Sequence, residues 1–198
     1  NSRPGTRLRA TLRDDAGEVA SAKVPADADF TPHLDLPIPE DRMQTWSPED
    51  PYLYELLIEL LDADGNVLDA AESYAGLRGV AVDGKAVKIN GRTIFQRLVL
   101  DQGYYPDGIM TAPTDDALRR DIELSMAAGF NGARLHQKVF EERFLYHADR
   151  LGYLVWGEFA DWNGVVRSGV HHNTMTAAWV THWLEALARD YSHPCIVG

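Results

Sequence analysis

The sequence predicts a two-part fold, in which an all-β sandwich precedes a parallel sheet covered by helices. Three observations lead to this prediction. In the first part, strand-like runs with period-two alternation recur at roughly 10-residue intervals. From about residue 95, apolar runs alternate instead with segments of helical period. The connections between the later runs are long enough for parallel crossovers, which places helices over the sheet.

Short strands and tight turns fill the first part, from residue 1 to about 94. Leu8, Ala10 and Leu12 alternate with polar residues, which is typical of a half-buried strand. Asp-Gly and Asn-Gly dipeptides favour hairpin turns between such strands. The expected strands are 8–13, 18–24, 53–61 and 66–71, with turns at 14–17, 62–65, 83–84 and 90–91.

A strand–helix unit recurs in the second part. Thr114 can cap the first helix, in which Leu118, Ile122 and Met126 fall on one face. A glycine follows each of the first two helices, and the second of these, Gly152, is a typical stop signal. The expected strands are 95–100, 130–135, 153–157 and 196–197, and the expected helices are 114–129, 141–151 and 175–191.

The bulk composition excludes several classes of partner. A formal net charge of -11 argues against nucleic acid and against anionic membrane surfaces. No apolar run approaches the length that spans a bilayer, and Cys195, the single cysteine, allows no internal disulfide. No Gly-rich phosphate loop or nucleophile elbow is present, so no cofactor is predicted. Neutral ligands such as sugars remain compatible with this composition.

Six short motifs occur in an order and spacing that resemble glycoside hydrolase family 2. The segment Trp-Ser-Pro-Glu-Asp-Pro-Tyr-Leu-Tyr at 46–54 resembles the entry to a late strand of that family's immunoglobulin-like domain. Gly-Phe-Asn-Gly-Ala-Arg-Leu-His at 129–136 resembles its second barrel strand, and 149–158 its third helix–strand junction. The remaining three motifs lie at 76–78, 89–92 and 193–198.

This resemblance implies an immunoglobulin-like β-sandwich over residues 1–82. Residues 83–198 are then the first β/α units of an incomplete (β/α)₈ TIM barrel. The implied activity of the parent protein is retaining hydrolysis of O-glycosidic bonds in β-glycosides, which needs two carboxylates about 5–5.5 Å apart. In the family, the acid/base follows the fourth strand and the nucleophile ends the seventh. Both positions lie past Gly198, so no catalytic residue is predicted within this chain, and a carbohydrate is the expected partner of the full-length protein.

A different class of function stays open at this stage. A standalone, non-catalytic module that binds carbohydrate or protein partners through the sandwich would also fit the composition. The substrate sugar is not specified by the residues present.

Five residues are candidates for lining a pocket, because functional residues of barrels lie at strand carboxyl ends and in the loops that follow. The resemblance implies that Arg134 holds the nucleophile carboxylate; alternatively it pairs with Glu158, which we expect to lie close to it. His136 can bond a sugar hydroxyl or be structural. Asp101 can line the pocket or cap a turn, and Glu158 can be a buried carboxylate satisfied by backbone amides. Trp162 is a candidate stacking platform for a pyranose.

Other conspicuous residues have structural interpretations. Trp156 is expected in the core, and Trp179 and Trp183 in helix packing. The pair His171-His172 is expected in a surface loop, because adjacent side chains diverge and no third ligand is evident, so no metal site is predicted. The later strands are apolar on both faces and leave an open edge, which predicts self-association through the open barrel face.

Overall fold

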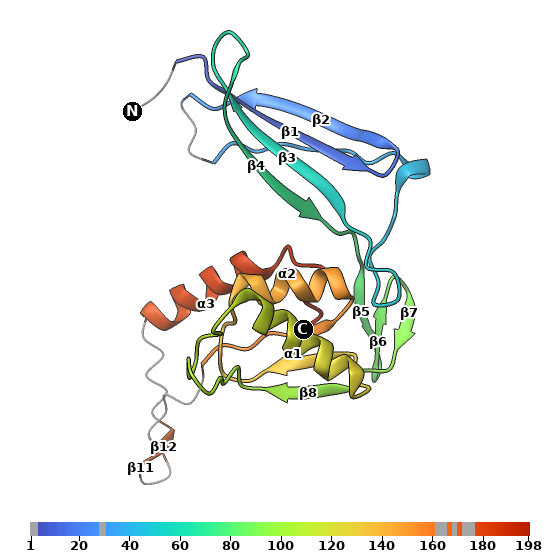
Figure 1. Ribbon diagram of the computed structural model, residues 1–198, viewed down its shortest axis with the longest axis vertical. Coiled ribbons are helices and arrows are strands. Elements are labelled where there is room, and N and C mark those ends of the chain that lie inside the picture. The colour runs from blue at the N-terminus through green and yellow to red at the C-terminus, as the bar shows by residue number, and fades with distance from the viewer. Residues whose placement is uncertain (1–3, 28–30, 161–165, 168–169, 172–176) are drawn as a thin grey trace. The chain divides into compact units, whose positions relative to one another are not determined.

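The computed structural model describes residues 4–27, 31–160, 166–167, 170–171 and 177–198 (Figure 1). It contains two compact units, one formed by Asn1–Thr45 with Tyr52–Leu77 and the other by Trp46–Pro51 with Arg78–Gly198. The first unit is built from β-strands and the second carries the α-helices, so the protein is β-rich with a smaller helical part. The predicted division into 1–82 and 83–198 stays a prediction.

The first unit is an antiparallel sheet whose strands match the predicted runs closely. Its order is β2-β1-β3-β4. The strands are β1 (Arg7–Asp14), β2 (Gly17–Pro25), β3 (Tyr54–Leu61) and β4 (Val67–Ala75), and a 3₁₀ turn, η1 (Glu40–Arg42), lies in the long connection. Ala10 and Leu12 are buried, but Thr11 between them is buried as well and Leu8 is half-buried, so burial along β1 does not follow the predicted period of two.

Two side-chain contacts stabilise this unit. Arg9 and Glu59 face each other across β1 and β3 and form a two-point ion pair, with nitrogen–oxygen distances of 2.7 and 2.8 Å. The phenol of Tyr54, which is fully buried, donates to the carbonyl of Arg42 at 2.7 Å and accepts from the amide of Gln44 at 2.6 Å. These bonds hold the connection between β2 and β3 beside the start of β3.

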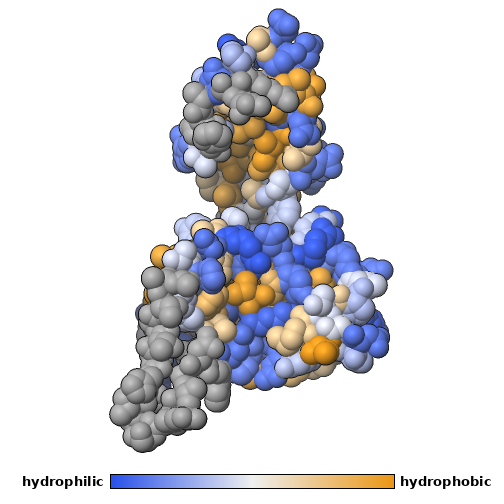
Figure 2. Space-filling view, turned by 90° about the vertical axis from the view of Figure 1, so that its left-hand side faces the viewer, coloured by the Kyte–Doolittle hydropathy of each residue, from blue (hydrophilic) through white to orange (hydrophobic). Residues whose placement is uncertain are grey.

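Within its described residues this unit contains one sheet, so the second layer of the predicted sandwich stays a prediction. Figure 2 shows apolar surface on this unit beside hydrophilic residues. Its exposed large apolar side chains are Met43, Val67 and Leu68, the last two on the edge strand β4. An exposed edge of this kind is a ready site for further pairing.

The second unit combines a short antiparallel hairpin sheet with a parallel sheet and helices. The hairpin sheet has the order β5-β6-β7 and the parallel sheet the order β10-β9-β8. The elements are β5 (Val80–Asp83), β6 (Ala86–Ile89), β7 (Arg92–Ile94), β8 (Leu98–Asp101), α1 (Asp115–Ala127), β9 (Gly132–Leu135), α2 (Glu142–Leu151), β10 (Leu154–Trp156), β11 (Val166–Arg167), β12 (Val170–His171) and α3 (Ala177–Asp190). Ile196 continues the parallel arrangement by bridging to Val155. The expected adjacency of the second and third parallel strands is confirmed, whereas the first begins at Leu98 rather than at residue 95, and Phe95 is exposed.

The helix ends follow the chemistry that the sequence predicts. The hydroxyl of Thr114 accepts a hydrogen bond from the amide of Ala117 at 3.1 Å and so caps α1. Gly152 ends α2 with a φ of 71°, and a Cβ at this position would meet the backbone of Pro48. Of the three residues expected on one face of α1, Leu118 and Ile122 are buried, whereas Met126 is exposed near the end of the helix.

A buried network joins α2 to the segment that leads into the last strand. The indole of Trp46 donates to the backbone carbonyl of Asp149 at 2.7 Å, and both residues are fully buried. The Asp149 carboxylate accepts from the amide of Cys195 at 2.8 Å. The guanidinium of Arg78 donates to the carbonyls of Pro194 at 3.1 Å and Ile196 at 2.7 Å. The bond between Asp149 and Cys195 and the bonds from Arg78 together hold Ile196 at its pairing position.

Candidate functional site

The parallel sheet has two faces of different character. Arg134 pairs with Leu100 on one side and with Trp156 on the other, and all three side chains are exposed. The neighbouring register position contains Ala133 and Val155, which are fully buried. Alternation along the strands thus separates an exposed face, which includes Arg134, from a buried face.

Arg134 and Glu158 form an ion pair at the carboxyl end of this sheet, as the sequence predicts. Nε of Arg134 donates to Oε1 of Glu158, and the arginine side chain is 50% exposed. The other carboxylate oxygen, Oε2, accepts from the amide of Gln137 at 3.1 Å. Glu158 therefore bridges the guanidinium on β9 and the backbone just after that strand.

The bridge includes a residue in an unusual backbone conformation. Gln137 has a φ of 58°, in the left-handed region that favours glycine. For other residues this region costs on the order of 1–2 kcal/mol. The hydrogen bond from its amide to Glu158 offsets part of that cost, so the carboxylate both orients Arg134 and holds the chain reversal after β9.

Asp101 lies at the carboxyl end of β8 but on the other face of the sheet. It pairs in register with the buried Leu135. Its Oδ1 accepts from the amide of Gly103 at 2.8 Å, which is the turn-capping contact. Burial raises the pKa of the Asp101 carboxyl, and the hydrogen bond from Gly103 opposes this effect. A role for Asp101 in a pocket stays a prediction.

His136 follows β9 directly and lies against the start of the loop after β8. Its amide donates to the carbonyl of Asp101 at 2.7 Å. Its Nδ1 lies 3.2 Å from Nε2 of Gln102, an exposed residue. The ring is partly exposed, so a ligand can reach it, and the lining role proposed for His136 stays a prediction.

The tryptophans divide into three cases. Trp162 and the His171-His172 side chains lie outside the residues that the structure describes.

Trp156 was expected in the core, but it is 37% exposed, because it shares a face with Arg134. Its indole donates to Oε1 of Gln96 at 2.6 Å. Trp179 packs against Trp183 with ring centres 5.3 Å apart, although Trp183 remains exposed.

Sequence reasoning missed two residues that shape this edge of the sheet. Gln137 was missed because its contribution is a backbone amide in a conformation that its side chain does not indicate. Lys138 was missed because it reads as a surface lysine, yet its ammonium donates to the carbonyl of Met110 at 2.7 Å and lies 4.7 Å from the centre of the Phe140 ring. The position of Lys138, three residues after a strand and two before Phe140, is the signal in the sequence that favours such a contact.

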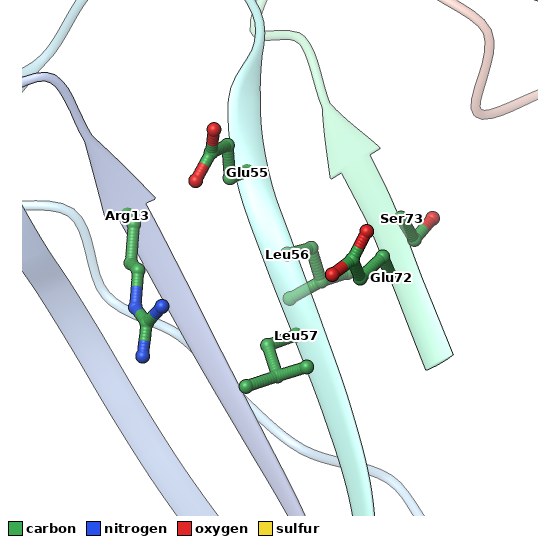
Figure 3. A pocket seen from close by; sticks show the side chains of 6 residues that line it. All are labelled: Arg13, Glu55, Leu56, Leu57, Glu72 and Ser73. Atoms are coloured by element: carbon green, nitrogen blue, oxygen red, sulfur yellow. The ribbon is translucent and has the colours of Figure 1, made fainter. Parts of the chain in front are cut away.

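A separate hollow of about 220 Å³ lies on the first unit (Figure 3). Charged side chains from three strands border it, and its full lining is Arg13, Glu55, Leu56, Leu57, Glu72 and Ser73. In Figure 3, Glu55 and Glu72 stand on neighbouring strands on either side of Leu56. No aromatic ring lines it, so it lacks a stacking platform for a sugar.

Two negative findings apply to the described part of the chain. No group of three or more His, Cys, Asp or Glu side chains is arranged there to hold a metal ion. Of the helices found in those ranges, none is long and apolar enough to cross a bilayer.

A sequence profile and two curated relatives point to the same family of proteins. Residues 3–78 match the sequence profile described as glycosyl hydrolases family 2. A β-galactosidase of Vibrio cholerae is 29% identical over 164 residues, which cover 77% of this chain and 15% of that protein. A β-glucuronidase of Paenibacillus borealis is 29% identical over 207 residues, which cover 99% of this chain and 33% of that protein.

A solved structure extends the match over the second unit. A glycosyl hydrolase family 2 member from Bacteroides cellulosilyticus DSM 14838 is 27% identical, with a TM-score of 0.72 over 96% of this chain and 26% of that one. Residues 3–78 match glycosyl hydrolase family 2, and the relatives and the solved structure indicate the same family for the rest of the chain. The chain spans 15% of the length of the Vibrio cholerae protein and 33% of the length of the Paenibacillus borealis protein. The Arg134–Glu158 bridge lies on the exposed face of the parallel sheet.

Proposed function

We propose that this chain is part of a retaining glycoside hydrolase that acts on the O-glycosidic bonds of β-glycosides. Under this proposal residues 1–82 form an immunoglobulin-like sandwich and residues 83–198 the first β/α units of a (β/α)₈ barrel. Both catalytic carboxylates lie outside these 198 residues. The observation that carries the proposal is the Arg134–Glu158 pair at the carboxyl end of a parallel sheet, in a chain of family 2.

Arg134 supplies the electrostatic part of the proposed mechanism. Its Nε is used by Glu158, which leaves the two terminal nitrogens to bind a second carboxylate. A guanidinium beside a nucleophilic carboxylate keeps it ionised, because the opposite charge lowers its pKa. Glu158 fixes the guanidinium plane, so that this orientation does not have to be established during the reaction.

His136 and Gln102 supply the proposed hydrogen-bonding groups for the sugar. Their side chains meet at 3.2 Å at the start of the βα loop, where a sugar hydroxyl would approach the strand ends. An imidazole and a carboxamide together offer both a donor and an acceptor for a hydroxyl. We assign them to binding of the glycone.

The test compares the full-length protein with the 198-residue chain. Both are incubated with aryl β-glycosides of galactose, glucuronic acid and mannose, and the anomer of the first-formed product is followed by NMR. We expect turnover with retention by the full-length protein and none by the 198-residue chain. Inversion, or turnover by the shorter chain that survives repurification, contradicts the proposal. Sugar binding measured by calorimetry without any turnover would favour the non-catalytic module instead.

A further inference from the structure

The loop after β8 folds back on itself as a two-bond hairpin. The amide of Tyr105 donates to the carbonyl of Ile109 at 2.8 Å, and the amide of Ile109 donates back at 2.9 Å. A second turn follows, in which the carbonyl of Gly108 accepts from the amide of Thr111 at 3.0 Å. This hairpin begins four residues after β8 ends, at the carboxyl edge of the parallel sheet (Figure 1).

Ile109 is the strained residue of this hairpin. Its φ is 56°, a left-handed value that a β-branched side chain rarely adopts. Such residues persist where the surrounding structure enforces them, and they gather at functional sites. Asn or Gly would fit the same backbone without this strain.

The hairpin is anchored at both of its ends. The ammonium of Lys138, a side chain only 12% exposed, donates to the carbonyl of Met110 at 2.7 Å. Gly103, with a φ of 63°, leaves the space that Lys138 and Phe140 occupy, since a Cβ there would meet both side chains. On the other strand of the hairpin, burial and the hydrogen bond and charge of Asp121 raise the pKa of the Tyr105 phenol. The loop is therefore a fixed support rather than a free segment.

The hairpin and the residues next to it carry three exposed apolar side chains. Tyr104 is 63% exposed, Ile109 64% and Met110 41%. We call these three side chains the ledge. Gln102, two residues before Tyr104, contacts His136 just after β9, so the ledge follows in sequence directly after a residue assigned to the glycone.

We propose that the ledge binds the apolar leaving group of the glycoside substrate, and that Tyr104 and Ile109 thereby determine specificity for that group. The assignment rests on the proposed glycosidase function and deepens it. A glycoside presents a polar ring on one side of the scissile bond and an aglycone on the other, and the segment after β8 carries both a polar contact, at Gln102, and exposed apolar side chains.

A small apolar group is a better occupant than a protein partner. Stable protein interfaces bury about 800 Å² on each side, an area well beyond what three side chains supply. An aryl or alkyl group is of the size that one aromatic and two aliphatic side chains can cover. The anchoring by Lys138 also favours this occupant, because a prepositioned contact surface binds a small ligand without an added ordering cost.

The test uses Ile109→Asn in the full-length enzyme with two substrates of the same sugar. One is an apolar aryl glycoside and the other is the glycosyl fluoride, whose leaving group does not reach the ledge. We expect the ratio of kcat/KM for the aryl glycoside to that for the fluoride to fall about 10-fold, while the melting temperature stays level or rises. Tyr104→Ala, which leaves the strained backbone untouched, should lower the same ratio.

Val82→Asn is the matched control, because Val82 is 71% exposed and β-branched but lies on β5, in the hairpin sheet. It should leave the ratio unchanged. An unchanged ratio in both Ile109→Asn and Tyr104→Ala, with both variants folded, overturns the assignment. Absence of turnover by the unmodified enzyme on both substrates refutes the proposed function itself, and the ledge assignment with it.

Discussion

The Asp149 carboxylate lies 2.6 Å from Nδ1 of His193, in the interior of the second unit. Its other oxygen accepts from the amide of Cys195. Asp149 is fully buried, and each of its carboxylate oxygens has a hydrogen-bond partner. The pair connects α2 to the residues that lead into Ile196, the residue that bridges to Val155. The position of the last parallel strand thus depends on a buried carboxylate.

We predict that Asp149→Ala destabilises the second unit severely. The substitution removes the oxygen that accepts from the amide of Cys195 and the oxygen in contact with Nδ1 of His193, and each buried polar group left unsatisfied costs about 1–3 kcal/mol. Urea denaturation followed by tryptophan fluorescence measures the loss. Asp116→Ala is the control: Asp116 is an exposed partner of Arg119, and its removal should cost less than about 1 kcal/mol. Equal effects of the two substitutions would contradict the structural role of Asp149.

Arg134→Ala should lower activity far more than stability. The Arg134 side chain is half exposed, so its pair with Glu158 contributes about 0–1 kcal/mol to folding. In the full-length protein the same change removes the proposed cation beside the nucleophile, and we expect kcat/KM to fall by about 100-fold or more. Arg120→Ala, which loses only a surface pair with Glu123, should leave both quantities unchanged. A melting temperature lowered in proportion to activity would show that Arg134 is structural.

Glu158→Gln and Glu158→Ala separate the two contacts of the bridge. The glutamine retains one oxygen as an acceptor but loses the charge that holds Arg134, whereas the alanine also releases the amide of Gln137. We expect kcat to decrease about 10-fold with glutamine and further with alanine, with smaller changes in KM. Gln137→Gly, which removes the backbone strain, should partly rescue the alanine variant. No difference between glutamine and alanine would rule out the contribution of the Gln137 amide.

Asp101→Asn should make the protein more stable at neutral pH. The folded-state pKa of Asp101 is raised by burial, so the folded state disfavours its ionised form. Its contribution to stability is therefore present below the unfolded pKa of about 4 and is lost as pH rises through the higher folded value. Asparagine keeps an oxygen for the Gly103 amide and carries no charge. Melting temperatures at pH 3 and pH 7 should show the gain only at pH 7; the same gain at both values would exclude this explanation.

The isolated 198-residue chain should self-associate. Leu100 and Trp156 are exposed on the same face of the parallel sheet as Arg134, and an open sheet with an apolar face favours association. Light scattering gives the mass in solution, and Trp156→Glu should shift it towards the monomer. A monodisperse monomer that binds no hydrophobic dye would disprove this prediction.

Local patterns were sufficient to predict most of the strands and helix ends. The strand predicted from Leu8, Ala10 and Leu12 depends on neighbouring residues alone and is found as β1, although burial there does not alternate, because Thr11 is buried as well. Thr114 and Gly152 act through hydrogen bonds and backbone angles within their own helices, so their roles are also visible in the sequence.

The exposure of a side chain was harder to predict, because it depends on which helices and strands pack against it, and the local sequence pattern does not specify them. Trp156 has the composition of a core residue, but its strand places it on the face of Arg134, where no described helix covers it. The approach of Arg134 to Glu158 followed from strand adjacency and is confirmed. The bond from Gln137 to Glu158 and the reach of Lys138 to Met110 required tertiary geometry, so no periodicity indicates them.

The three bonds that Arg78 makes to the carbonyls of His193, Pro194 and Ile196 have a kinetic consequence. Arg78 begins the longer of the two segments of the second unit, and Ile196 lies near the end of that segment, 118 residues later. A contact of this span closes nearly the whole unit into one loop, and contacts of high sequence separation slow folding because the chain must be ordered before they form. Arg78 therefore secures the unit late in its assembly, and its loss should act mainly on the rate of unfolding.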